Sequence, residues 1–150
     1  MKKLFMLFVI LCCLTLTSCK LGHIEDTNGE SNYELSTLTK EDIFTYKSYI
    51  EVGSVNSNDG NSFRYSCKKL SGNKLIKTIT PNGRRLKFDI SYDIIAGNAY
   101  LVLICNDEIY KEIPPHRATT ITIEGEEEYQ LRILAESANV SLGVAVSEEK

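Results

Sequence analysis

Residues 99–105 read Ala-Tyr-Leu-Val-Leu-Ile-Cys, a continuous apolar run that is typical of a central strand. An Asn-Asp turn follows the run, and a second extended segment over residues 108–113 ends at a Pro-Pro pair. The run therefore predicts a buried strand that turns directly into the next strand.

Segments with a period of two lie on both sides of this run. Phe63, Tyr65 and Cys67 alternate with polar residues, and turn residues such as Gly60 separate neighbouring segments. The expected strands cover residues 44–52, 63–67, 74–80, 86–90, 99–105, 108–113, 119–123, 129–133 and 140–146. About eight or nine short strands, without a long segment of helical period, predict an all-β domain. We expect a single antiparallel β-sandwich with jelly-roll-like winding over residues 42–150.

The composition fits one ordinary globular domain, since 43% of the 150 residues are hydrophobic and 25% are charged. Residues 19–41 begin with Cys19 and continue as a polar stretch without steady periodicity, so we expect a flexible linker there. Thr39 and Asp42 have the spacing of a capping pair and predict a short helical turn just before the domain.

Residues 1–18 have the form of a signal peptide. A short basic start is followed by an uncharged apolar run over residues 4–16, which is too short to span a bilayer comfortably. The sequence Leu-Thr-Ser-Cys at residues 16–19 resembles the lipobox of bacterial lipoproteins. The resemblance implies that residues 1–18 are removed and that Cys19 carries a diacylglycerol, with palmitate as an acyl group. The alternative is a secretory signal cut nearby, with Cys19 an unmodified thiol.

A lipid on Cys19 would determine where the protein resides. One acyl chain binds a membrane only marginally, because each buried CH₂ contributes about 0.8 kcal/mol, whereas two chains anchor a protein stably. We therefore expect the domain to be tethered to the cell membrane on its extracytoplasmic face. This location and the formal net charge of −3 argue against a nucleic acid partner.

Cys67 and Cys105 are the two cysteines of the expected domain. An extracytoplasmic compartment allows a disulfide between them. Such a bridge would close a loop of about 38 residues and contribute roughly 4 kcal/mol in the chain-entropy model. Two unpaired thiols that behave as small hydrophobic residues are the alternative.

The charges are unevenly distributed along the chain. Residues 64–87 contain eight bases and no acid, whereas the C-terminal part is rich in acids. The candidate residues for an anionic surface are Arg64, Lys68, Lys77, Arg85 and Lys87. Together they would present a basic sheet face to an anionic leaflet, a teichoic acid or another anionic envelope polymer. The alternative is cross-strand pairing with the acid-rich C-terminal part, which leaves no net basic patch.

From residue 63 to residue 146 the order of segments is similar to β-sandwich modules in small, uncharacterised lipoproteins of low-GC Gram-positive bacteria. The matching parts are an alternating aromatic strand, a Pro-Asn-Gly turn, the apolar run at residues 100–104 and Tyr-Gln-Leu-Arg-Ile at residues 129–133. The resemblance implies a β-sandwich module and brings no catalytic residue with it.

Motifs for catalysis, for a metal or for a cofactor do not stand out in the sequence. Ser66 and Lys69 have the Ser-x-x-Lys spacing, but on a strand residues three apart point to opposite faces. His116 lies in an extended segment without a recognisable nucleophile or orienting acid. The acids at residues 124–128 fit a solvated turn better than a cation site. We expect no metal, no cofactor beyond the lipid and no enzymatic activity.

These features predict a lipid-anchored, extracytoplasmic, non-catalytic binding module of the cell envelope. Its partner would be an envelope protein or an anionic polymer that docks on the basic sheet face. The alternatives are a small envelope hydrolase with paired carboxylates, and a structural or immunity-type lipoprotein. Two converging acids of raised pKa in a concave site would favour the hydrolase, and a flat basic face would favour the binding module.

Overall fold

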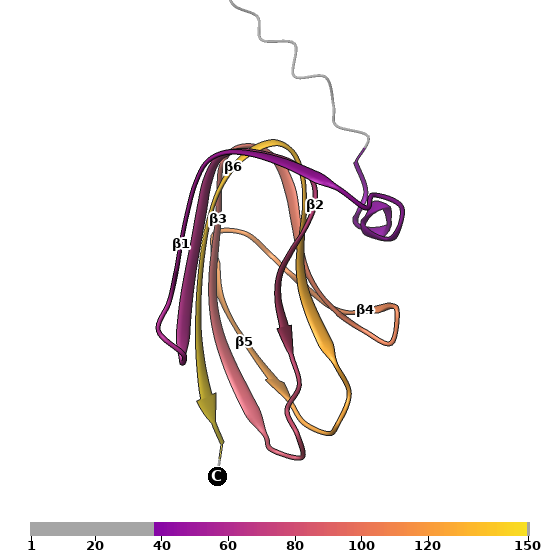
Figure 1. The fold of residues 1–150 in the computed structure, drawn as a ribbon, viewed down its shortest axis with the longest axis vertical. Helices are drawn as coiled ribbons and strands as arrows, with labels where there is room; N and C mark the ends of the chain where they lie inside the picture. Colours follow the sequence, from indigo (N-terminus) through magenta and orange to yellow (C-terminus); the bar gives the residue numbers. More distant parts are fainter. Residues whose placement is uncertain (1–37, 150) are drawn as a thin grey trace, which may run out of the picture. The chain divides into compact units, whose positions relative to one another are not determined.

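The computed structural model describes residues 38–149 (Figure 1). The elements are η1 (Lys40–Phe44), a short 3-10 helix, and the strands β1 (Tyr49–Asn58), β2 (Ser62–Ile79), β3 (Leu86–Cys105), β4 (Glu108–Ile113), β5 (Arg117–Ile123) and β6 (Tyr129–Glu148). Every strand pair is antiparallel, which confirms the all-β prediction. Among the described residues, no helix is long and apolar enough to cross a membrane. The predicted signal peptide and the lipid on Cys19 lie outside this range.

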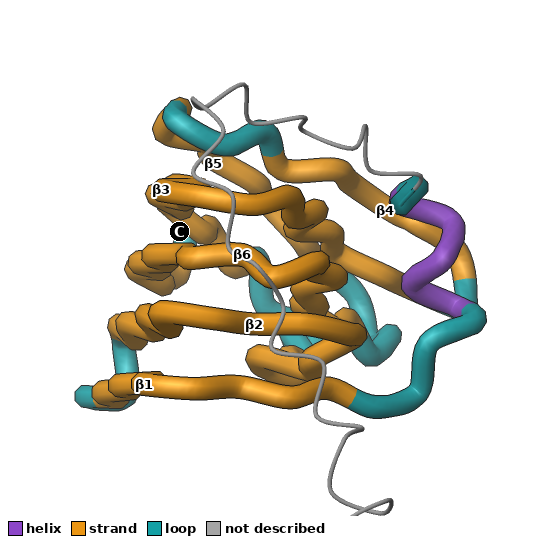
Figure 2. The backbone as a smooth tube through the Cα atoms, turned by 90° about the horizontal axis from the view of Figure 1, so that it is seen from above, coloured by secondary structure: helices purple, strands orange, loops and turns teal. Residues whose placement is uncertain are grey.

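All six strands belong to one hydrogen-bonded sheet with the order β1-β2-β6-β3-β4 (Figure 2). β3 pairs with β6 along its whole length. The other edge of β3 is shared, because β5 pairs with its first part and β4 with its last part. Three strands of about twenty residues, β2, β3 and β6, thus form the centre of the sheet.

These three long strands bend sharply near their middle, so that the sheet folds over on itself (Figure 1). The pairing register shifts there, between Cys67 and Gly72 in β2 and between Ile94 and Asn98 in β3. Gly97 has a φ of 75° at the bend, a conformation that suits glycine because it has no Cβ. We call the half with residues 62–70, 86–94 and 139–148 the first leaf. The half with residues 73–79, 99–105 and 129–135 is the second leaf.

The core lies between the two leaves. Buried side chains from both leaves, such as Phe88 and Leu142 from the first and Leu101 and Ile133 from the second, form one cluster. A smaller cluster covers the outer side of the second leaf, where Ile43 of η1 packs against Val102, Ile104 and Leu134. The apolar run at residues 99–105 is therefore buried on both sides, which explains why it does not alternate.

The strand count differs from the prediction for a physical reason. Nine segments were expected, and three neighbouring pairs of them each form one bent strand, which leaves six. Gly72, which lies between two expected strands, is part of the bend of β2, and the sheet is continuous where we expected a β-sandwich with jelly-roll-like winding. Residues 44–46 are not a strand, because the η1 turn precedes β1. The capping prediction is confirmed, since the Thr39 backbone N–H donates to the Asp42 carboxylate at 2.8 Å.

Candidate functional site

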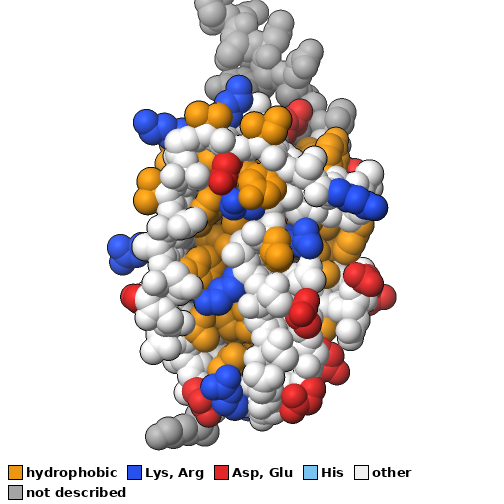
Figure 3. Space-filling view, in the orientation of Figure 1, with side chains coloured by type: hydrophobic (Ala, Val, Ile, Leu, Met, Phe, Trp, Pro, Cys, Tyr) orange, Lys and Arg blue, Asp and Glu red, His pale blue; other side chains and the backbone are white. Residues whose placement is uncertain are grey.

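A groove of about 370 Å³ opens at the edge of the folded sheet, between the first and second leaves. Its lining residues are Asn56, Ser57 and Asn58 of β1, Phe63, Arg64 and Tyr65 of early β2, and Lys74, Leu75, Ile76 and Lys77 of late β2. We call it the edge groove. β1 pairs with β2 only as far as Gly72, so no described strand covers the outer edge of late β2. Figure 3 shows a hollow with hydrophobic side chains and several basic groups along this face.

Lys74 joins the two leaves inside this groove. Its ammonium group lies 2.9 Å from a carboxylate oxygen of Glu51 on β1, and both side chains are largely buried. The Tyr65 hydroxyl donates to the same carboxylate at 2.8 Å. The ammonium also lies over the rings of Tyr49, at 4.1 Å, and Tyr65, at 5.3 Å. One acid, one base and two aromatic rings thus form a network at the end of the groove nearest the bend, in which both charged groups have partners.

The titration properties of this network follow from its contacts. The hydrogen bond from Lys74 lowers the pKa of Glu51, against the opposing effect of burial. Burial by itself lowers the pKa of Lys74, but its contacts with Glu51 and Tyr49 outweigh burial and raise the pKa. Burial, followed by the hydrogen bond to Glu51, raises the pKa of Tyr65 well above its ordinary value. The pair is therefore charged over the physiological range and contributes no net charge to the groove.

Arg64 and Lys77 give the edge groove its net positive charge. Within residues 38–149 neither side chain forms an ion pair with an acid. Lys77 extends over the ring of Phe63, with its ammonium 5.1 Å from the ring centre. An ammonium over an aromatic ring still has its N–H donors free for an anion.

The other three basic residues predicted from the sequence lie elsewhere. Arg85 lies 3.0 Å from Glu149 and 3.9 Å from Glu124, and Lys87 lies 3.6 Å from Asp89. The acid-rich C-terminal part thus supplies partners for Arg85, which was the alternative considered for the whole basic stretch. Lys68 lies at the bend of β2, where its side chain occupies the space that a Cβ at Gly53 would enter. Of the five predicted residues, Arg64 and Lys77 line a common groove.

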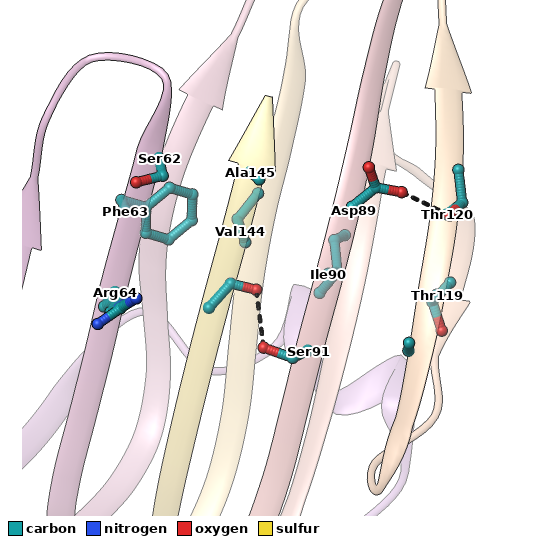
Figure 4. A pocket seen from close by; sticks show the side chains of 12 residues that line it. Ser62, Phe63, Arg64, Asp89, Ile90, Ser91, Thr119, Thr120, Val144 and Ala145 are labelled. Carbon is teal, nitrogen blue, oxygen red and sulfur yellow. Dashed lines mark hydrogen bonds between the residues drawn. The ribbon is translucent and has the colours of Figure 1, made fainter. Parts of the chain in front are cut away.

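A second, shallower hollow of about 300 Å³ lies on the outer face of the first leaf (Figure 4). Small residues such as Gly143 and Ala145 form its floor, and Arg64 lies at its border. Its polar groups are already engaged, because Thr120 donates to Asp89 at 2.7 Å and Ser91 donates to the Gly143 carbonyl at 3.4 Å. Arg64 is among the lining residues of both hollows.

The two cysteines of the domain are free thiols, so the possible disulfide between Cys67 and Cys105 is not formed. Cys67 is buried beside the bend, where its register partner on β6 is Val140. Cys105 ends β3 at the opposite end of the second leaf, next to Tyr129. A bridge is prevented because these register partners are separated by most of one half of β6.

Few of the described residues are candidates for acid–base catalysis or for metal binding. His116 Nδ1 lies 3.2 Å from Asp93 Oδ1, so the structure supplies an acid that the sequence did not indicate. Both side chains are more than half exposed. Over residues 38–149, no group of three or more His, Cys, Asp or Glu side chains converges as a metal site.

The sequence analysis missed Glu51 and gave Lys74 no special role. A lone acid inside the apolar and aromatic stretch of residues 49–55 is the signal that was available for Glu51. Its partner is 23 residues away along the chain and meets it only because β2 folds over. The local sequence pattern can therefore indicate Glu51 as unusual, but it cannot identify Lys74 as its partner.

Comparisons with known proteins add little to this description. No protein-family model matches the chain, and no curated protein matches it. A solved structure titled "Secreted serine protease VesC from Vibrio cholerae" aligns with a TM-score of 0.38 and 12% sequence identity. The alignment covers 67% of this chain and 22% of that chain, so the chain spans about a fifth of that protein.

Proposed function

We propose that the protein is a lipid-anchored, extracytoplasmic, non-catalytic binding module that takes an anionic envelope polymer in its edge groove. The observation that carries the proposal is the pair Arg64 and Lys77. Both cations line one groove of about 370 Å³, and neither has an acidic partner among residues 38–149. Unpaired cations beside an open groove favour repeated negative charge in the ligand.

The chemistry of the groove narrows the kind of ligand. Phe63 and Ile76 supply apolar contact, and the Asn56 and Asn58 amides are available to hydroxyl or phosphate oxygens. A flexible polymer of phosphate and polyol units presents both kinds of group. The groove is open along late β2, so a chain longer than the groove can pass through it.

The non-catalytic part of the proposal rests on the carboxyl groups. Within residues 38–149, the carboxyl groups with a shifted pKa are those of Glu51, Asp59 and Asp89, and all three pKa values are lowered. A general acid needs the opposite shift. The contact between His116 and Asp93 is exposed to water and gives no support to a buried charge relay.

The lipid anchor rests on the sequence at residues 16–19. Cys19→Ala should abolish palmitate labelling of the chain in cells. Continued labelling of this variant would refute the anchor and would leave the binding role of the groove to be judged separately.

Binding is tested with a soluble, fluorescent poly(glycerol phosphate) and the chain that starts at Lys20, by fluorescence anisotropy at low salt. The double variant Arg64→Gln/Lys77→Gln should weaken binding by about thirty-fold, if each unpaired cation contributes about 1 kcal/mol. The control Arg85→Gln/Lys87→Gln removes the same charge from residues that already have acidic partners and should have a much smaller effect. Equal losses in both double variants, or no binding by the parent chain, would refute the groove as the site.

A further inference from the structure

Exposed hydrophobic side chains are concentrated in one short part of the chain. Among the residues that the structure describes, the exposed large hydrophobic side chains are Phe44, Tyr46, Tyr49, Ile50, Val52, Val55, Leu75, Ile95 and Tyr110. Six of these nine lie between residues 44 and 55, and Ile50 is the most exposed of all, at 74%. A contiguous apolar patch on a protein surface marks an interaction site more often than scattered apolar residues do.

This part of the chain lies at the bent end of the sheet. Ile50 is the register partner of Ser71 and Val52 that of Lys69, so both lie next to the bend of β2. Ile95, at 68% exposure, lies on the bend of β3 at the same end of the strands. Figure 3 shows hydrophobic side chains along this upper end, with basic and acidic side chains among them.

The backbone that carries these side chains is firmly held. The Asn73 side chain is buried at 5% exposure, and its amide donates to the carbonyls of Ile43 at 2.6 Å and Tyr46 at 2.8 Å. The Asn73 backbone N–H donates to the Ser48 carbonyl at 2.9 Å. The segment that leads into β1 is thus fixed to the sheet from beneath, and its hydrophobic side chains remain exposed on a rigid support.

Basic residues accompany the exposed hydrophobic ones. Lys47, Lys68 and Lys69 are close in sequence or register to Tyr46, Gly53 and Val52, and none of the three lysines forms an ion pair within residues 38–149. The acid in this stretch, Glu51, points into the edge groove and pairs with Lys74. A further acid, Glu136, lies on the bend of β6.

We propose that the bent end of the sheet docks on an anionic lipid surface. The docking surface consists of Tyr46, Ile50 and Val52 together with Lys47, Lys68 and Lys69, and we call it the membrane rim. Aliphatic and aromatic side chains enter the interface between headgroups and acyl chains, while lysines contact the headgroups.

Charge favours a lipid surface over a second copy of this chain. Two copies that met through their membrane rims would bring six lysines together, with no acid of the rim to neutralise them. Anionic headgroups neutralise all three lysines of one copy at once. The rim is also distinct from the edge groove, so this inference stands on separate residues from the proposed function.

The test uses the chain that starts at Lys20, which retains every contact described for residues 38–149 and lacks the apolar N-terminal run. Its partition is measured by sedimentation with vesicles of equal parts phosphatidylglycerol and phosphatidylcholine, and with vesicles of phosphatidylcholine alone. We expect binding to the anionic vesicles at low salt and a marked loss of binding at high salt.

Two rim variants separate the contributions. Lys68→Gln/Lys69→Gln should lower the partition coefficient about thirty-fold, because each base near an anionic surface contributes about 1 kcal/mol. Ile50→Ser/Val52→Ser should lower it at least tenfold, on the order of the loss of two inserted aliphatic side chains. The matched control is Tyr110→Ser/Lys111→Gln on β4, at the far edge of the sheet, which combines an exposed ring with an adjacent exposed lysine. Circular dichroism verifies that all variants fold.

Three results would overturn the proposal. The first is equal binding to both kinds of vesicle, and the second is an equal loss in the control variant. The third is sedimentation equilibrium showing a dimer that Ile50→Ser/Val52→Ser dissociates, together with unchanged vesicle binding. In that case a second copy, and not a lipid surface, covers the rim.

Discussion

Gly97→Ala tests the idea that close backbone packing at the bend holds the folded sheet together. Gly97 has a φ of 75°, and a Cβ added there would lie 2.6 Å from the Ser137 carbonyl oxygen and 2.8 Å from the Ala138 Cα. The left-handed conformation costs an L-residue about 1–2 kcal/mol. Overpacking against backbone that cannot rotate away adds roughly 1–3 kcal/mol. The sum, about 2–5 kcal/mol, is a large part of the stability of an ordinary domain.

Gly60→Ala is the matched control. Gly60 has a φ of 93° in the turn between β1 and β2, and nothing lies within 4 Å of an added Cβ. It should therefore lose only the conformational part, about 1–2 kcal/mol. The assay is urea unfolding followed by circular dichroism, in which Gly97→Ala should lower the midpoint on the order of 1–2 M. Equal midpoints for the two variants would refute the reasoning, because the added Cβ at residue 97 would then have no steric cost against the backbone of β6.

Two further predictions concern polar groups. Tyr92 is buried at 1% exposure, and its hydroxyl has no hydrogen-bond partner among the described residues. Tyr92→Phe should therefore stabilise the fold by about 1 kcal/mol, measured as a higher urea midpoint. A lower midpoint would instead reveal a partner for the hydroxyl. The lowered pKa of Glu51 stabilises the fold above the ordinary value of 4.5, and this contribution is lost as the pH falls through the folded-state pKa. Glu51→Gln should therefore flatten the acid side of the stability profile, whereas an unchanged slope would show that the pair contributes no pH dependence.

Local patterning predicted the strand segments well but not how they join. The expected strands at residues 63–67 and 74–80 are both present, and the residues between them are the bend of one strand. A glycine with positive φ serves a tight turn and a sharp bend equally well, so the residues at 71–73 are compatible with both. Whether the chain reverses or continues depends on the register with β6, which is a long-range contact.

The apolar run at residues 99–105 is a second case in which a long-range contact could not be predicted from the local pattern. Its composition correctly predicted a buried central strand. Ile43 packs against its outer side and lies in η1, about sixty residues earlier in the chain. The capping pair predicted this helical turn, but it did not indicate that the turn would pack on the apolar run. The apolar pattern thus indicates that both sides of the strand are buried, but not which residues bury the outer side.

The basic residues show why a charge run does not define a site. All eight bases of residues 64–87 are close in sequence, yet their environments differ because neighbouring strands differ in charge. Arg85 pairs with Glu149, the residue after β6, whereas Lys77 lies over the ring of Phe63. Net charge along a segment therefore overestimates the basic surface that the fold presents.

The bend between the two expected strands of β2 also creates the candidate site. Phe63 and Lys77 lie fourteen residues apart on a single strand, and in an extended strand they would be tens of ångströms from each other. Folding over at Gly72 brings the ammonium of Lys77 to 5.1 Å from the ring of Phe63, so that β2 lines both sides of the edge groove. Because a single strand supplies both walls, the width of the groove depends on the geometry of the bend. Changes at Gly72 should therefore alter ligand binding together with stability, whereas changes at Arg64 should alter binding alone.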